Sequence, residues 1–245
     1  MKVLPFLSML AVSSMLIFSS CGSGDEKKTT DNAATDTTKA TTTEPAPVNT
    51  IVTTPQAMIV VRHKVKDFAQ WKISYDAHDS LRLAFGIHSY VIGRGEMDSN
   101  MVFVATKADD IAKAKAFGKD PSLKLAMQKG GVIGAPTVQF ETIVFQDTVA
   151  IDSKLRVLNE LTVKDWDAWQ KAFSGGNQER TDNGIVVRAY GHGESDNHKV
   201  SLVTALTDTA KAHAYWKSDM LKKRREASGV IGEPKRFVFR IVQRY

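Results

Sequence analysis

Cysteine is nearly absent from this sequence of 245 residues, and Cys21 is the single example. The domain that follows it therefore has no intramolecular disulfide and no cysteine nucleophile. Well-marked catalytic motifs are missing too: the chain has no phosphate-binding loop, no nucleophile elbow and no HExxH zinc motif. The sequence therefore predicts an architecture and a cellular address, and it marks no reaction.

Strong charge and a membrane-spanning run are also missing. The formal net charge is +6, and part of it lies in four successive cations at 222–225. Such a run usually forms a solvated helix face, and no recognised nucleic-acid motif accompanies it, so we expect no nucleic-acid partner. An anionic lipid surface would suit these charges better. The apolar run Leu4–Phe18 is shorter than the ~20 residues that a helix needs to cross a bilayer.

The first twenty residues have the pattern of an export signal. Lys2 supplies a positive charge, Leu4–Phe18 is the apolar segment, and two serines precede Cys21. This arrangement resembles the lipobox of bacterial lipoproteins, in which the signal is cleaved and the cysteine is acylated with chains such as palmitate. Two or more acyl chains give stable anchoring. The resemblance implies a bacterial cell-envelope protein held to a membrane lipid through Cys21, with its domain outside the cytoplasm; the alternative is a plain secretory signal with a leftover cysteine.

Residues 21–56 form a low-complexity segment rich in Thr, Asp, Lys, Ala and Pro. Almost nothing in it could bury enough apolar surface to offset the entropy of ordering, so we expect a disordered linker. A flexible coil of this length reaches ~30–35 Å on average, enough to hold a domain clear of a membrane. The alternative for such a Thr-rich tract is an O-glycosylated stalk.

The rest of the chain is a tandem repeat. Val65–Trp71 (VKDFAQW) returns as Val163–Trp169 (VKDWDAW), a shift of 98 residues that holds without a gap to the end. The motif GVIGAP at 131–136 returns as GVIGEP at 229–234 under the same shift. Self-similarity of this kind decides the architecture before any single residue is interpreted. It predicts two similar units, at 57–147 and 153–245.

Each unit has the same order of expected elements. Asp67 is a helix N-cap candidate, and Gly86 is a candidate for the left-handed position that ends the same helix. The first unit is then a strand at 57–64, one helix up to 86, a hairpin of strands at 87–93 and 101–106, helices at 109–117 and 121–129, and a strand at 137–145. The order is β-α-β-β-α-β, the ferredoxin-like split unit.

The second unit departs from the first at Ser174-Gly175-Gly176, in the middle of its first helix. Two glycines there cost ~2 kcal/mol relative to alanines, so we expect this helix to be broken or shortened. In both units the helices cover one face of a sheet only, and the other face needs a cover. The two copies can bury these faces against each other, which predicts an α+β fold with a closed barrel in a monomer, an internal pseudo-dimer.

The repeat resembles the dimeric α+β barrel superfamily, which includes antibiotic biosynthesis monooxygenase-like domains and haem-degrading monooxygenases. The residues that carry the resemblance are VKDFAQWK at 65–72, YDAH at 75–78, Arg82, Gly86, Ser89-Tyr90 and GVIGAP at 131–136. The resemblance implies a ligand cavity between helices and sheet in each half. It implies fold more than chemistry, because members of such a superfamily share architecture and not reactions.

One helical face carries the candidate site. It contains Phe68, Trp71, Tyr75, His78 and Arg82, which recur at steps of three and four. We take His78 and Arg82 as candidate catalytic residues, since an imidazole exchanges protons near neutral pH and a guanidinium stabilises an anion. His63 and His88 are candidates to lie nearby. The expected ligand-binding residues are Phe68, Trp71, Tyr75, Trp169, Phe173 and Arg180.

Structural explanations compete with this site. The aromatic residues can be core, with His78 and Arg82 reaching water at its edge. Gly176 stands at the position equivalent to His78, so catalysis by that histidine would operate in one half only. The set His192, Glu194 and His198 could be imagined as a metal site, but it falls on a hairpin turn and turn chemistry explains it better. No metal and no cofactor are therefore expected.

Three functions remain open. The preferred one is a lipid-anchored module that binds a small aromatic or apolar molecule without catalysis. The second is a cofactor-independent monooxygenase or cyclase that uses His78 as acid and base and Arg82 as charge stabiliser. The third is a structural cell-envelope protein whose barrel serves as a partner platform.

Overall fold

The computed structural model describes residues 50–245, which form one compact unit. The predicted export signal, the acylation of Cys21 and most of the predicted linker lie outside these residues. Within the described part, no helix is both long enough and apolar enough to span a membrane.

Both repeats have the same elements at the same spacing. The first contains β1 (Ile51–Val52), β2 (Gln56–Val65), α1 (Phe68–Ala77), α2 (Asp79–Ala84), β3 (Ile87–Gly95), β4 (Met101–Ala108), α3 (Ile111–Phe117), α4 (Pro121–Lys129) and β5 (Val132–Asp147). The second contains β6 (Leu155–Val163), α5 (Trp166–Ser174), α6 (Asn177–Asp182), β7 (Ile185–Gly193), β8 (Lys199–Leu206), α7 (Thr209–Trp216), α8 (Asp219–Ala227) and β9 (Val230–Arg244). Apart from β1, every element of the first repeat has its counterpart 98 residues later, within a residue or two at its ends.

The strands close into a barrel. The sheet order is β1-β5-β2-β4-β3-β9-β6-β8-β7, and a further pairing of β5 with β7 joins its ends. Two of these pairings link the repeats, and they are equivalent under the 98-residue shift: Gly95 faces Phe239 between β3 and β9, and Gly193 faces Glu141 between β7 and β5. The predicted α+β barrel with an internal pseudo-twofold axis is confirmed.

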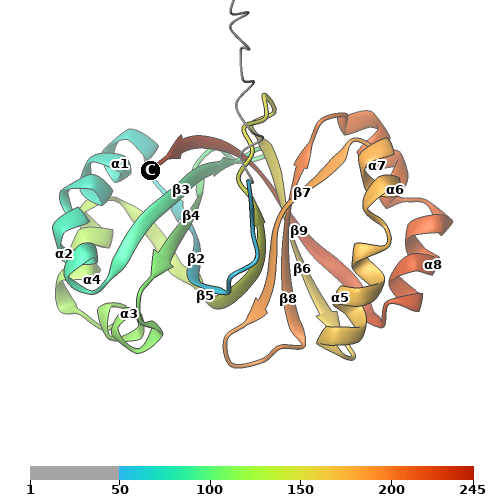
Figure 1. Ribbon diagram of the computed structural model, residues 1–245. Helices are drawn as coiled ribbons and strands as arrows, with labels where there is room; N and C mark the ends of the chain where they lie inside the picture. The colour runs from blue at the N-terminus through green and yellow to red at the C-terminus, as the bar shows by residue number, and fades with distance from the viewer. Residues whose placement is uncertain (1–49) are drawn as a thin grey trace, which may run out of the picture. The chain divides into compact units, whose positions relative to one another are not determined.

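The helices lie outside the barrel, α1 to α4 beside the first repeat and α5 to α8 beside the second (Figure 1). Successive side chains of a strand point to opposite faces. Met58 and Val60 of β2 therefore belong to the cluster inside the barrel, while Ile59 belongs to a cluster with Phe117 of α3. The inner cluster includes Phe103 and Phe239, which come from different repeats and stack at a centroid distance of 4.1 Å. Strand β2 therefore has two buried faces, one toward the barrel axis and one toward the helices.

The first correction concerns the linker, which we expected to run to residue 56. Ile51 and Val52 form β1, paired antiparallel with Gln146 and Asp147 at the end of β5. Thr50 adds a side-chain hydrogen bond to Asp147 at 3.1 Å. The ordered domain therefore begins some residues earlier, because an apolar strand can add to the end of a sheet.

The second correction concerns the helix expected from Asp67 to Gly86. Asp67 caps it as predicted, accepting from the backbone of Gln70 at 2.7 Å, and Gly86 adopts the left-handed conformation at φ 67°. The helix is nevertheless interrupted at His78, which separates α1 from α2. The second repeat breaks at the equivalent residue, Gly176. The two glycines are therefore not the cause of the break, because the first repeat breaks without them.

An arginine bridges the break in both repeats. The Nη1 of Arg82 donates to the carbonyl oxygen of Tyr75 at 2.6 Å, and the Nη2 of Arg180 donates to that of Phe173 at 2.9 Å. Each guanidinium also lies over the same residue's ring, at 3.7 Å from Tyr75 and 3.8 Å from Phe173. A carbonyl that ends one helix is thereby satisfied by the helix that follows.

Candidate functional site in the first repeat

A cavity of about 280 Å³ lies in the first repeat between the helices α1 to α4 and the outer face of the sheet. Alternate residues of three strands form its floor: Ile59, Val61 and His63 from β2, Val104 and Thr106 from β4, and Pro136, Val138 and Phe140 from β5. Ile87 of β3 and helical side chains form the rest, the latter including Trp71, Phe117, Leu123, Ala126 and Met127. The lining is largely apolar, so the space favours an apolar occupant.

His63 is the titratable group on the floor of the cavity. Its side chain is 8% exposed, and neither ring nitrogen has a hydrogen-bond partner among residues 50–245. Burial lowers the pKa of His63 to about 4, so the ring is neutral at pH 7 and offers one donor and one acceptor. Its ring lies 5.4 Å from that of Trp71. An unpaired buried imidazole is costly, and a polar group of a ligand would relieve the cost.

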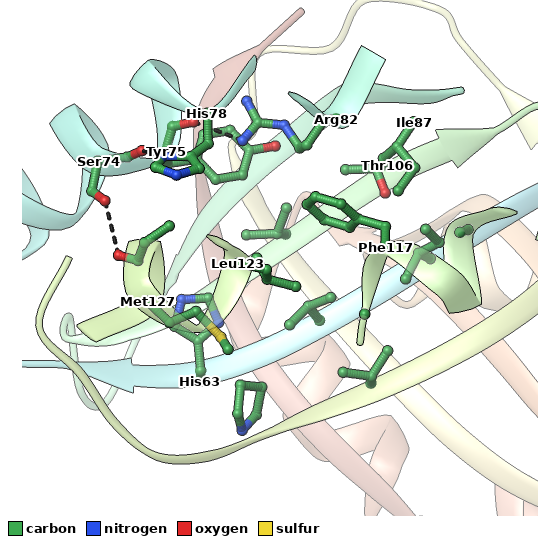
Figure 2. A pocket seen from close by; sticks show the side chains of 18 of the residues that line it. His63, Ser74, Tyr75, His78, Arg82, Ile87, Thr106, Phe117, Leu123 and Met127 are labelled. Atoms are coloured by element: carbon green, nitrogen blue, oxygen red, sulfur yellow. Dashed lines mark hydrogen bonds between the residues drawn. The ribbon is translucent and has the colours of Figure 1, made fainter. Parts of the chain in front are cut away.

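The helices supply the polar groups on the opposite side. Figure 2 shows His63 on the strand at the lower side of the view and Tyr75, His78 and Arg82 on the helices at the upper side. The Nδ1 of His78 lies 3.1 Å from the carbonyl oxygen of Ser74, an oxygen that can only accept. This contact assigns the proton of a neutral His78 to Nδ1 and leaves Nε2 as a base.

Two more side chains near His78 already have partners. The hydroxyl of Tyr75 shares a hydrogen bond of 2.8 Å with Ser89, and burial raises the pKa of Tyr75. Ser74 donates to the carbonyl oxygen of Ala126 at 2.9 Å, which ties α1 to α4. These bonds fix the walls of the cavity and leave fewer polar atoms free for a ligand.

Arg82 is held by structural contacts. Besides its bond to Tyr75, its Nη2 donates to Asp79 at 2.9 Å, and the side chain is buried. Only its Nε has no partner among the described residues. The equivalent Arg180 makes the same bond to its own helix, so this geometry favours a role in bridging the helix break. The expected catalytic role of Arg82 stays a prediction.

The structure brings most of the predicted site together. Trp71, Tyr75, His78 and Arg82 all line the cavity, as does His63. Phe68 does not line it, because it packs at the edge of the core under the guanidinium of Arg94, 4.4 Å from the ring centre. His88 points elsewhere and pairs with Asp109 at 2.9 Å on the surface. The break between α1 and α2 removes none of these residues from the cavity, because Arg82 of α2 lines it together with Trp71 and Tyr75 of α1.

Sequence reasoning missed the second helical pair, which closes the cavity. Phe117 and Gly118 at the end of α3 and Leu123, Ala126 and Met127 of α4 all line it. A signal was present in the repeat itself, because the residues 98 positions after Gly118, Ala126 and Val138 are Trp216, Arg224 and Arg236. Small residues in one copy and large ones in the other mark a space that only the first copy keeps open.

The second repeat has only a remnant of this cavity, with a volume of about 90 Å³. Trp169, Phe173 and Arg180 line it as predicted from the repeat, but so do Trp216, Arg224 and Arg236. The guanidinium of Arg236 lies 5.0 Å from the ring centre of Trp216. The larger side chains therefore occupy the space that Gly118, Ala126 and Val138 leave free in the first repeat.

A charged network completes the filling of the second repeat. Glu179 accepts from Arg224 and from the hydroxyl of Tyr215, the latter at 2.6 Å. The hydrogen bond from Arg224 holds the pKa of Glu179 below its usual range. Burial and Glu179 together raise the pKa of Tyr215 to about 12. In the first repeat Leu81, Ala126 and Phe117 stand at these three positions, so no such network can form there.

The turn residues that could be imagined as a metal site have other partners: Glu194 pairs with Lys115 at 2.9 Å, and both histidines contact the backbone. The Nδ1 of His192 lies 2.9 Å from the carbonyl oxygen of Gly193, and the Nδ1 of His198 lies 3.0 Å from that of Val163. Across residues 50–245, no three side chains of His, Cys, Asp or Glu are grouped so as to hold a metal ion.

Solved structures with the same fold include three whose likeness covers both repeats. One is a Fusobacterium nucleatum protein whose name provisionally gives it as a monooxygenase, with a TM-score of 0.51 and 13% identity over 77% of this chain and 93% of that one. Another is an anthrone oxidase-like protein, with a TM-score of 0.54 and 12% identity over 79% and 94%. A third is a mutant chlorite dismutase from Candidatus Nitrospira defluvii, with a TM-score of 0.50 and 9% identity over 77% and 92%.

These likenesses establish the fold expected from the superfamily resemblance. Each covers more of this chain than one repeat contains, so both halves of the barrel take part. Identities of 9% to 13% carry no information on substrate or reaction. No protein-family profile matches the chain, and no curated protein matches it in sequence.

Proposed function

We propose that the first repeat binds one small, mainly apolar molecule and that the second repeat is the structural half of the barrel. The observation that carries the proposal is the cavity of about 280 Å³ in the first repeat, whose counterpart in the second is reduced to about 90 Å³ by larger side chains. Both halves have the same backbone. The difference therefore comes from side chains alone, which favours a binding role over a packing defect.

The volume limits the ligand. An engineered cavity of about 150 Å³ holds benzene, and drug-sized ligands occupy about 300–1,000 Å³. A space of about 280 Å³ suits a molecule of one or two rings or a short aliphatic chain. The aromatic wall of Trp71, Tyr75 and Phe117 favours a flat ring system, which can stack on these side chains.

His63 adds a chemical requirement. The neutral imidazole offers a donor and an acceptor that nothing in residues 50–245 satisfies. A hydroxyl or carbonyl group on the ligand would pair with it, and one such bond contributes about 0.5–1.5 kcal/mol. The ligand class that fits best is a small aromatic molecule with one hydroxyl or carbonyl group, such as a phenol or a quinone.

A titration with 2-naphthol and naphthalene tests this proposal. Both are two-ring molecules of similar shape, and only 2-naphthol carries a hydroxyl. We expect a single site for both, with 2-naphthol bound several-fold more tightly, and we expect His63→Leu to remove the difference. Leu stands at the equivalent position of the second repeat, Leu161, so the substitution suits the fold. Absence of saturable binding of both probes would contradict the proposal and favour the partner-platform function.

Catalysis is a second candidate, and the orientation of His78 supports it. With Nδ1 held by Ser74, Nε2 of His78 can accept a proton from a bound phenol. Such a step is the first that a cofactor-independent monooxygenase or cyclase would need. If His78→Gln abolishes turnover of a ligand found by native mass spectrometry while its affinity stays within a few-fold, the protein is an enzyme; unchanged turnover rejects this candidate.

We further propose that Cys21 tethers this binding domain to a bacterial membrane from outside the cytoplasm. The support is the export-signal pattern before Cys21 and the Thr-rich segment after it. Metabolic labelling with a palmitate analogue in a bacterial host should mark the wild-type chain and leave Cys21→Ser unlabelled. Labelling of both would place the acyl chain elsewhere, and labelling of neither would favour the plain secretory signal.

A further inference from the structure

A second cavity, of about 80 Å³, lies inside the barrel on the pseudo-twofold axis. Its lining contains equivalent residues from both repeats: Met58 with Arg156, Val60 with Leu158, Tyr90 with Arg188, Phe103 with Ser201, Glu141 with Phe239, and Gln146 with Arg244. In three of these pairs the second repeat contributes an arginine where the first contributes a neutral side chain. One end of the axis therefore gathers Arg156, Arg188 and Arg244.

Two of these arginines are almost fully buried. Arg156 is 2% exposed and Arg188 is 6% exposed. The Nη1 of Arg156 donates to the carbonyl oxygens of Ser153 and Leu155, at 2.7 and 2.9 Å, and no carboxylate among the described residues pairs with it. A buried guanidinium is normally matched by a carboxylate or another anion, so Arg156 lacks a counter-charge.

The carboxylates nearby do not supply it. Asp147 pairs with Arg188 at 3.1 Å and also accepts from Thr50 and from the backbone of Val149. Glu141 lines the same cavity, but it accepts from Ser201 at 2.5 Å, and the charges that act on it are those of Glu160 and Arg62. Three guanidinium groups therefore lie at this end of the cavity with one carboxylate, Asp147, which already accepts hydrogen bonds from other groups.

The titration behaviour of the arginines agrees with an excess of positive charge. Burial, followed by the charges of Arg244 and Arg188, lowers the pKa of Arg156 to about 10. Burial also lowers the pKa of Arg188, with Arg244 adding to the effect and Asp147 opposing it. Like charges are held together here without a partner that would stabilise all three.

We propose that this end of the barrel binds one small oxyanion between Arg156, Arg188 and Arg244. A volume of about 80 Å³ equals that of two to three water molecules at about 30 Å³ each, which suits sulfate, phosphate or a single carboxylate group. Guanidinium groups match the geometry of such oxygens through paired N–H donors. Arg244 is exposed at the end of β9, so the anion has access from solvent. This site is separate from the first-repeat cavity, and it stands whether or not that cavity binds a ligand.

Isothermal titration calorimetry with sodium sulfate tests the proposal. The sample is the chain from residue 21 to residue 245, and sodium chloride keeps the ionic strength constant. Sulfate keeps its charge across the working pH range, and acetate in a parallel titration distinguishes a carboxylate from a tetrahedral oxyanion. We expect one saturable site. Arg156→Met and Arg244→Gln, which install the residues of the first repeat at positions 58 and 146, should each weaken the affinity at least tenfold.

Arg240→Gln is the matched control. Arg240 lies on β9 like Arg244, but it is exposed and pairs with Glu96 outside the cavity. Its replacement should leave sulfate affinity within twofold. Arg156→Met removes a buried unpaired charge, so it should fold, and Arg244→Gln changes an exposed side chain, so at least one variant gives a clear result. Heat that does not saturate, or equal affinity in Arg156→Met and the wild type, would overturn the proposal.

Discussion

The two repeats have the same backbone fold and differ in the size and charge of the side chains at equivalent positions. In the first, Gly118, Ala126 and Val138 leave space between helices and sheet; in the second, Trp216, Arg224 and Arg236 occupy it. Inside the barrel the difference has the same direction, because the second repeat supplies the three arginines and the first supplies Met58, Tyr90 and Gln146. In both places the second repeat carries the charged side chains, and the first repeat has neutral residues at the equivalent positions.

This comparison shows what a tandem repeat permits that a dimer of identical chains does not. In a symmetric dimer, a residue that fills one cavity fills both, and an arginine near the axis meets its own copy. Two copies in one chain can diverge independently. Here one copy can keep a cavity for a ligand while the other carries charge to the axis, without loss of the pairing between β3 and β9 or between β5 and β7.

The largest effect is expected on ligand affinity, when residues of the second repeat are introduced into the first-repeat cavity. We expect Gly118→Trp with Ala126→Arg to fill it as Trp216 and Arg224 fill the second. Leu81→Glu adds the carboxylate that pairs with the arginine, as Glu179 does in the second repeat. Gly118 has an ordinary helical φ of −58°, and a side chain there meets its nearest atom at 3.4 Å. Affinity for 2-naphthol should fall at least 100-fold, as measured by fluorescence titration.

The control for that variant is Leu125→Lys. It also installs the residue of the second repeat, Lys223, on the same helix α4, but Leu125 is exposed and does not line the cavity. Its affinity for 2-naphthol should match that of the wild type. Retention of tight binding in the triple variant would mean that the probe binds somewhere other than the first-repeat cavity.

Removing the carboxylate of the second repeat should destabilise the protein by about 2–4 kcal/mol. Glu179→Leu leaves both Arg224 and the hydroxyl of Tyr215 without their partner. Adding Arg224→Ala should recover much of the loss, because both residues then match the first repeat at Leu81 and Ala126. Urea unfolding of the two variants measures this; equal stabilities would show that the pair is not coupled.

His63 should make stability depend on pH between about 6.5 and 4. Its folded pKa of about 4 lies below the unfolded value of about 6.5, so the unfolded chain binds more protons in this window. Stability is therefore full above pH 6.5 and falls as the pH decreases, by about 2–3 kcal/mol at pH 4.5 at about 1.36 kcal/mol per unit.

Urea unfolding at pH 7 and pH 4.5 measures the free energy of unfolding at each pH. Acidification should lower this free energy by about 2–3 kcal/mol less in His63→Leu than in the wild type. His88→Val is the control, since His88 is exposed, pairs with Asp109 and has a valine, Val186, at its equivalent position. If wild type and His63→Leu lose the same stability on acidification, His63 is not held neutral by burial.

The smallest change in stability is expected for substitutions at the break between α5 and α6. Gly175 has a helix-compatible φ of −65°, and an alanine there makes only ordinary contact, at 3.6 Å. Since Ala77 is its equivalent, Gly175→Ala should stabilise the protein by about 0.5–1 kcal/mol. Gly176→Ala should gain less, because its Cβ would lie 2.8 Å from Arg180 and 3.0 Å from Arg224. Thermal unfolding of the two variants tests the order; a larger gain at Gly176 would contradict it.

Much of the site could be predicted from the helix that carries it. Trp71, Tyr75, His78 and Arg82 recur at helical spacing, and all four line the cavity. The break at His78 could not be predicted, because the bond from Arg82 to Tyr75 that bridges it spans seven residues and leaves no local pattern. Phe68 has the right spacing but starts the helix at its far end, beyond the cavity.

By itself, the sequence determined the repeat, the order of strands and helices in each copy and the need of each sheet for a cover, because periodicity, capping residues and left-handed glycines act over a few residues. Only the tertiary structure decided which face of each strand points to the helices and which to the axis. Both faces are buried once the barrel closes, so alternation in the sequence no longer distinguishes them. For the same reason, the isolation of His63 and the convergence of Arg156, Arg188 and Arg244 follow only from the closed sheet.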